Sequence, residues 1–62
     1  MDKELFKIGY SFLFGRKTYE IVAIFEDDGE TFYVTKTLTN YGVNSYCNIF
    51  YFTDNGELHK HV

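Results

Sequence analysis

The chain has 62 residues, a net charge of −3 and one cysteine, Cys47. The single cysteine excludes an intramolecular disulfide framework. The net negative charge disfavours electrostatic binding to nucleic-acid phosphates. No apolar run is long enough for a signal peptide or a membrane span. We therefore expect no membrane contact and a cytoplasmic location, with residues 1–62 forming a single small domain.

The first strand is predicted over Phe6–Phe14, after a loose or helical start at residues 1–5. Its large apolar side chains recur at every second position, which is typical of a half-buried strand. Gly9 in the middle of this stretch indicates a bulge or a bend. Gly15-Arg16 then has glycine at the first central position of a type II′ turn, and this turn pairs Phe12 with Tyr19.

The stretch Thr18–Glu26 is predicted as the central strand, because it holds β-branched and aromatic residues and neither Gly nor Pro. Asp28-Gly29 is typical of a type I′ turn. This turn predicts two cross-strand pairs, Phe25 with Phe32 and Ala23 with Val34. A three-residue turn that begins at Asp27 is the rival, and it would pair Ile24 with Phe32.

The third strand is predicted over Thr31–Leu38. The two-residue turn brings one set of its side chains into phase with the core face of the earlier strands, namely Phe32, Val34 and Leu38. The other set is expected to tolerate solvent, namely Thr31, Tyr33, Thr35 and Thr37. A slip of one residue would turn every side chain to the other face, so the agreement of two turns supports this arrangement.

The last third of the chain predicts a loop and a hairpin. Thr39–Asn44 is rich in turn-forming residues, and Ser45–Thr53 resumes as a fourth strand with apolar side chains on both faces. Asn55-Gly56 is a strong hairpin signal. It predicts a fifth strand that runs to Val62, with two pairs on one face, Phe52 with His59 and Phe50 with His61.

These elements predict an all-β fold, a five-stranded antiparallel meander that forms a curved sheet or a small SH3-like barrel. The order of a glycine, an aromatic strand, Tyr-x-Ile, an Asp-Gly turn and a second aromatic strand resembles small SH3-like barrels. The resemblance concerns strands and turns, so it implies a fold and no functional residue. An open curved sheet would bury its second face by dimerising.

Cys47, His59 and His61 are the candidate metal ligands and the candidate cysteine–histidine nucleophile. The predicted hairpin places both histidines on one face and Cys47 on the other, so the three side chains do not converge. The sequence also lacks a Gly-rich phosphate loop, a serine nucleophile motif and a supported carboxylate pair. We expect no metal, no cofactor and no enzymatic activity.

Six Tyr and seven Phe are more rings than one small core easily hides. Together with the two-sided fourth strand, they favour a non-enzymatic protein-interaction module, because aromatic residues are enriched at interfaces. We expect it to form a homo-oligomer, or to act as an accessory or inhibitory protein that occupies a partner's surface. The predicted partner-binding residues are Tyr33, Tyr41, Phe50, Tyr51, Phe52, Glu26, Asp27, Asp28 and Glu30.

Two alternatives accompany this hypothesis. The four acidic residues at the Asp28-Gly29 turn also suit a solvated hairpin end that discourages edge aggregation. The alternative function is single-stranded nucleic-acid binding, with bases stacked on exposed rings such as Tyr33 and Tyr51. A basic groove is missing from that hypothesis, since Arg16, Lys17 and Lys60 lie at a turn or near the chain end.

Overall fold

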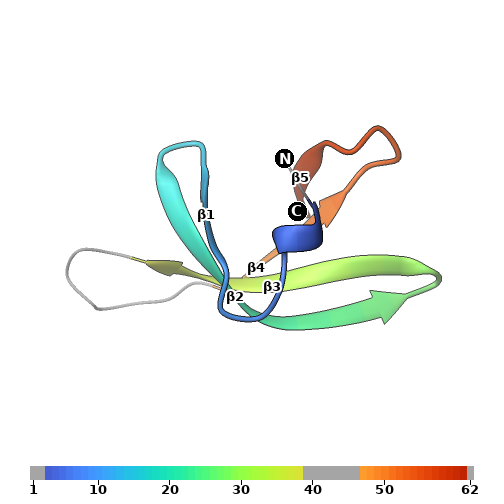
Figure 1. The fold of residues 1–62 in the computed structure, drawn as a ribbon, viewed down its shortest axis with the longest axis horizontal. Coiled ribbons are helices and arrows are strands. Elements are labelled where there is room, and N and C mark those ends of the chain that lie inside the picture. The colour runs from blue at the N-terminus through green and yellow to red at the C-terminus, as the bar shows by residue number, and fades with distance from the viewer. Residues whose placement is uncertain (1–2, 39–46, 62) are drawn as a thin grey trace.

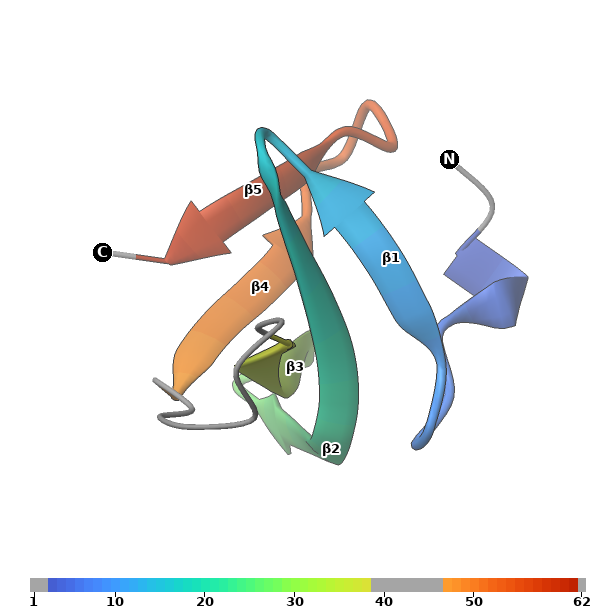
Figure 2. The same ribbon diagram turned by 90° about the vertical axis from the view of Figure 1, so that its left-hand side faces the viewer.

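The computed structural model describes residues 3–38 and 47–61, which form a short 3-10 helix and five strands. Their bounds are η1 (Lys3–Leu5), β1 (Ser11–Phe14), β2 (Lys17–Asp27), β3 (Glu30–Leu38), β4 (Asn48–Phe52) and β5 (Leu58–His61). Each strand pairs antiparallel with the next, in the order β1-β2-β3-β4-β5. The predicted all-β meander is confirmed, and its sheet curls into a half-barrel. Figure 1 shows β1 and the β4–β5 hairpin on the same side of the long β2–β3 hairpin, and Figure 2 shows the curl along its axis.

The first hairpin has the predicted turn and a shorter first strand than predicted. Gly15 has φ 65°, and Phe12 pairs with Tyr19 as expected for a type II′ turn. The strand begins at Ser11 rather than at residue 6, which corrects the prediction. The cause is the bend at Gly9, whose φ of 95° is readily adopted only by glycine. Residues 7–10 form a turn there, and Phe6 folds back onto the core with 4% of its surface exposed.

The β2–β3 hairpin closes through the predicted two-residue turn. Asp28 and Gly29 both have positive φ, 53° and 80°, as a type I′ turn requires. The two predicted pairs form, Phe25 with Phe32 and Ala23 with Val34. The rival three-residue turn is therefore not the one adopted.

A β-bulge in β2 changes which side chains of the hairpin face the core. The pairing shifts at Val22, so that Ile21 lies opposite Thr35 while Ala23 lies opposite Val34. One extra residue reverses the alternation of the strand beyond it. Tyr19 and Ile21 therefore point into the half-barrel, whereas Ala23 and the residues beyond it have exchanged faces.

The predicted core face of the third strand is wrong for this reason. Its buried side chains are Tyr33, Thr35 and Thr37, with 5%, 0% and 9% of their surface exposed. The predicted core residues Phe32, Val34 and Leu38 lie on the outer face, half-buried or exposed. Each buried threonine hydroxyl is hydrogen-bonded: Thr35 Oγ1 donates to the Asn48 carbonyl oxygen at 3.0 Å, and Asn48 Nδ2 donates to Thr37 Oγ1 at 3.4 Å.

The register of the β4–β5 hairpin differs by one residue from the predicted register. The connection spans residues 53–57 and is closed by Thr53, whose N–H donates to the Glu57 carbonyl and whose Oγ1 accepts from the Glu57 N–H. The observed pairs are Phe52 with Leu58, Tyr51 with His59, Phe50 with Lys60 and Ile49 with His61. The predicted pairing of the histidines with Phe50 and Phe52 is corrected, because a longer connection replaces the two-residue turn.

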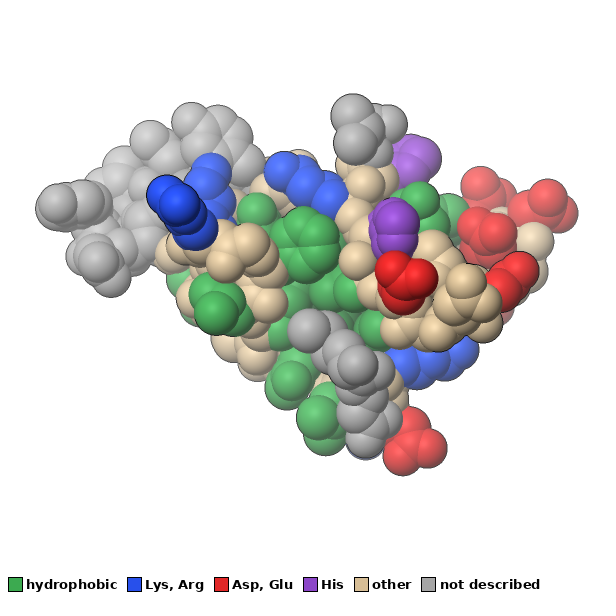
Figure 3. Space-filling model, turned by 90° about the horizontal axis from the view of Figure 1, so that it is seen from above, with side chains coloured by type: hydrophobic (Ala, Val, Ile, Leu, Met, Phe, Trp, Pro, Cys, Tyr) green, Lys and Arg blue, Asp and Glu red, His purple; other side chains and the backbone are tan. Residues whose placement is uncertain are grey.

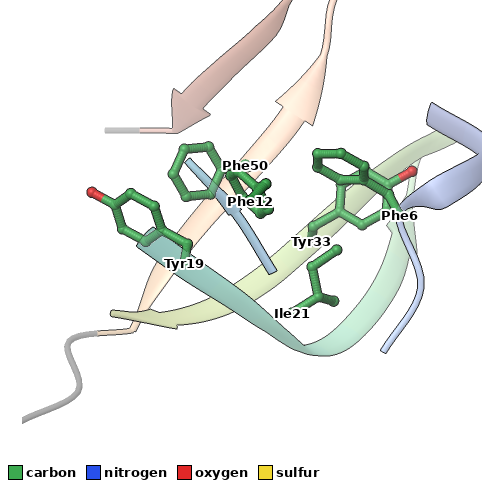
Figure 4. Packing of buried hydrophobic residues seen from close by; sticks show 6 residues of the cluster. All are labelled: Phe6, Phe12, Tyr19, Ile21, Tyr33 and Phe50. Atoms are coloured by element: carbon green, nitrogen blue, oxygen red, sulfur yellow. The ribbon is translucent and has the colours of Figure 1, made fainter. Parts of the chain in front are cut away.

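The core lies inside the curl and is largely aromatic (Figure 4). Phe50 is fully buried at its centre, with edge-to-face contacts to Phe12 and Tyr19 at centroid distances of 5.2 and 4.9 Å. The buried cluster consists of Phe6, Phe12, Tyr19, Ile21, Tyr33 and Phe50. Rings supply much buried area per residue, which a chain this short needs. Among the described residues, no helix has the length and apolar character required to cross a bilayer.

Candidate protein-binding face

The outer side of the sheet carries a row of aromatic side chains that starts beyond the bulge. Phe25 and Phe32 stack across the β2–β3 pair, with ring centroids 5.2 Å apart and an interplanar angle of 21°. Phe25 keeps 42% of its surface exposed although it lies in the middle of a long hairpin. The bulge thus moves two large rings from the interior of the half-barrel to its surface.

The row continues onto β4 and β5. Tyr51 lies 6.1 Å from Phe32, measured between ring centroids, and the His61 ring lies 6.0 Å from Phe32. His59 completes the row at 5.9 Å from Tyr51. We call this set the outer aromatic face, and it comprises Phe25, Phe32, Tyr51, His59 and His61. The pairs of Val34 with Ala23 and with Ile49 place further apolar side chains beside the rings.

The two histidines belong to this face because of the observed hairpin phase. The Tyr51–His59 and Ile49–His61 pairs put both imidazoles on the side opposite Phe50. The predicted placement of both histidines on the Phe50 face is therefore corrected. Cys47 is exposed, and the described residues contain no group of three His, Cys, Asp or Glu side chains arranged to hold a metal ion.

The acidic residues of the β2–β3 turn border the outer aromatic face at one end. The Asp27–Glu30 pair follows the Phe25–Phe32 pair along the hairpin, and Glu26 and Asp28 are exposed beside it. Figure 3 shows several acidic side chains gathered at one end of the molecule, and Lys and Arg side chains mainly towards the other end. The outer aromatic face therefore has an acidic border at the β2–β3 turn.

The predicted partner-binding residues fall into different environments. Phe50 and Tyr33 lie in the core, where their rings are covered by the protein itself. Phe52 is half-buried and packs against that core, whereas Tyr51 lies on the outer aromatic face. Tyr41 lies outside the described residues. All four acidic residues of the set are exposed at the β2–β3 end, namely Glu26, Asp27, Asp28 and Glu30.

Phe25 and Phe32 are the surface residues that sequence reasoning missed. Unbroken alternation through Val22 predicts that both lie in the core. The available signal was the central strand itself, which is apolar on both faces around Val22 and so does not favour either phase beyond it. Burial raises the pKa of Tyr33, because it penalises the charged phenolate.

The chain was compared with protein-family models, with curated proteins and with solved structures. None of the three comparisons finds a match.

Proposed function

We propose that this protein is a non-enzymatic protein-interaction module that self-associates through the outer aromatic face. The observation that supports it is the row of rings from Phe25 to His59, which crosses four strands on the solvent side of the sheet. An aromatic side chain can bury about 150–250 Å² of surface. Rings that are exposed in the monomer therefore gain favourable free energy of burial when a partner covers them. A second copy of the chain supplies the matching surface.

The size of the face suits a homodimer. A standard stable interface buries about 800 Å² on each partner. The Cα trace extends 36 × 21 × 20 Å, so the whole side of the molecule to which the outer aromatic face belongs has an area of this order. Most homodimers have a two-fold axis, which brings the same patch of both copies together.

Charge selects one of the two ways in which a two-fold axis can lie in the plane of this face. An axis along the β2–β3 hairpin would bring the two acidic ends together. An axis perpendicular to the hairpin keeps the acidic ends of the two copies apart. Repulsion between like-charged ends disfavours the first arrangement, so we favour the second.

Self-association leaves the acidic residues at the periphery of the dimer, where they are available to a basic partner. An accessory or inhibitory role that occupies such a partner's surface fits a chain without a described catalytic group. We also propose a cytoplasmic location, because one exposed thiol, Cys47, suits a reducing compartment. Single-stranded nucleic acid is a weaker candidate for the outer aromatic face, since the neighbouring carboxylates repel phosphates.

Sedimentation velocity of surface variants tests the proposed interface. Phe25→Thr and Tyr51→Thr remove rings from the face while keeping residues that suit a strand. We expect both variants to stay folded and to dissociate at concentrations where the unaltered protein is dimeric. Ile8→Thr is the matched control, since Ile8 is 68% exposed in the bend before β1 and outside the face. Dimerisation that survives both ring substitutions, or that Ile8→Thr abolishes equally, would place the interface elsewhere.

A further inference from the structure

A pocket of about 360 Å³ opens at the acidic end of the molecule, on the side of the sheet opposite the outer aromatic face. It lies where three parts of the chain meet: η1, the beginning of β3 and the β4–β5 connection. The residues that matter for its chemistry are Lys3, Glu30, Tyr33, Phe52 and Asp54. This pocket takes no part in the proposed dimer.

Two aromatic rings form the apolar part of the pocket. Tyr33 and Phe52 meet edge-to-face, with centroids 5.9 Å apart and an interplanar angle of 86°. The face of an aromatic ring carries partial negative charge and attracts a cation within about 6 Å of its centroid. The rings are held in place from behind by Phe6, whose ring centroid is 5.1 Å from that of Tyr33 and 4.9 Å from that of Phe52.

The Tyr33 hydroxyl is an unused polar group that faces this pocket. Tyr33 has only 5% of its surface exposed, and its hydroxyl makes no hydrogen bond to a residue in 3–38 or 47–61. No fully buried side-chain oxygen or nitrogen in this part of the chain lacks a partner, so the hydroxyl reaches solvent through the pocket. Figure 4 shows it directed away from Phe50, towards η1. A bound group with a hydrogen-bond donor would satisfy the phenol oxygen.

The charge around the pocket determines the sign of a ligand. Glu30 and Asp54 line it, and Asp27 at the end of β2 and Asp28 in the turn lie nearby. Among the described residues that line the pocket, Lys3 is the one cation. Acidic groups repel an anion and attract a cation. A guanidinium fits both parts of the pocket, because it stacks on aromatic rings and presents five N–H donors to oxygen acceptors.

We propose that this pocket binds the arginine side chain of a partner protein. The guanidinium packs against the Tyr33 and Phe52 rings on one side and faces the carboxylates of Glu30 and Asp54 on the other. Lys3 also lines the pocket, and its positive charge opposes the binding of a second cation. The site is independent of self-association, because it lies on the other face of the sheet.

The test is a ¹H–¹⁵N NMR titration with N-acetyl-L-arginine methylamide as the probe. N-acetyl-L-citrulline methylamide, which has nearly the same shape without the charge, is its control. We expect saturable shifts at the amides of Thr31, Thr53 and Gly56, with a Kd of about 1 mM for so small a ligand. Citrulline should give no saturable shift. Equal responses to the two probes, or no saturable response to arginine, would overturn the proposal.

Substitutions then distinguish binding in the pocket from a general attraction to the acidic end of the molecule. Asp54→Asn and Glu30→Gln should each weaken arginine binding by about fivefold, as expected for loss of one charge-assisted contact. Asp27→Asn and Glu26→Gln make the same chemical changes in residues that do not line the pocket, and they should change the Kd less than twofold. Lys3→Gln should tighten binding. Equal weakening by the paired variants would show attraction to the acidic end as a whole and contradict a built site.

The same spectra report whether each variant is folded. The oligomeric state of the protein should be the same with and without the probe. Failure of arginine binding therefore leaves the dimer proposal untouched, and a monomeric protein would leave the arginine proposal untouched.

Discussion

Phe25 and Phe32 stack face to face on the solvent side of the sheet, 5.2 Å apart between ring centroids, directly opposite one another across the β2–β3 hairpin. A single residue accounts for their position, because the bulge at Val22 exchanges the faces of everything beyond it in β2. Without the bulge, the alternation that buries Tyr19 and Ile21 would bury Phe25 as well. The functional surface of the molecule thus arises from a local irregularity in its longest strand.

Truncation of the central core ring should nearly abolish folding. Phe50 is completely buried and contacts rings from β1 and β2. Phe50→Ala should cost about 3–5 kcal/mol, from lost transfer free energy and the cavity left behind. A domain of this length has a comparable total stability, since folded chains are stable by about 0.05–0.15 kcal/mol per residue.

Circular dichroism during urea denaturation measures this effect. Leu13→Ala is the control, because Leu13 is 64% exposed on β1 and should change the midpoint little. A Phe50→Ala protein with an unchanged unfolding midpoint would contradict the aromatic core described above.

The type I′ turn provides a second prediction about stability. Gly29 has φ 80°, a conformation that disfavours a side chain, so Gly29→Ala should lower the free energy of unfolding by about 1 kcal/mol. Asp28→Gly, at φ 53°, should be neutral or slightly stabilising. Urea midpoints of the two variants distinguish them, and equal midpoints would show that the turn adopts another geometry in solution.

Thr35, a buried threonine of β3, should stabilise the fold more than valine, its apolar isostere. Thr35→Val preserves shape and strand preference but removes the hydroxyl that donates to the Asn48 carbonyl at 3.0 Å. We expect a loss of about 1 kcal/mol, typical of one buried hydrogen bond. Thr18→Val, at a half-buried position on β2, is the control and should cost little. If Thr35→Val were more stable than the unaltered protein, the Thr35–Asn48 bond would not contribute to stability.

The phenol of Tyr33 makes stability depend on alkaline pH. Burial raises the pKa of Tyr33, whereas a tyrosine in the unfolded chain ionises near its ordinary value of about 10. The unfolded state then releases its proton at a lower pH than the folded state. The stability contributed by the neutral phenol is fully present below pH ~10 and is lost as pH rises through the folded pKa.

Tyr33→Phe isolates that contribution. The unfolding free energy of the variant should fall less steeply above pH ~10 than that of the unaltered protein, when both are measured by urea denaturation at matched pH values. Other alkaline titrations are common to both proteins and cancel in the comparison. Parallel pH profiles would contradict a raised pKa of Tyr33 in the folded protein.

Most of the topology could be predicted from turn residues. Gly15-Arg16 and Asp28-Gly29 require particular turn types, and these types determine which residues pair in the first two hairpins. The bulge could not be predicted, because Val22 has no distinctive bulge chemistry and the strand is apolar on both sides of it. For that reason alone, the predicted core and surface side chains of β3 are the reverse of the observed ones.

The β4–β5 hairpin shows a second limit of prediction from turn residues. Asn55-Gly56 is typical of a two-residue turn, yet here it belongs to a five-residue connection closed by Thr53 and Glu57. Local turn preference was outweighed by hydrogen bonds that the threonine side chain and backbone make together. The consequence for the candidate site is large, since it moved His59 and His61 onto the outer aromatic face.

The molar mass in solution, measured by light scattering over a wide range of protein concentration, tests the central claim most directly. Self-association through the outer aromatic face predicts a mass that approaches twice the 7.3 kDa of the chain as concentration rises. A mass that stays at 7.3 kDa at millimolar concentration would contradict it and would leave the exposed rings for a different partner.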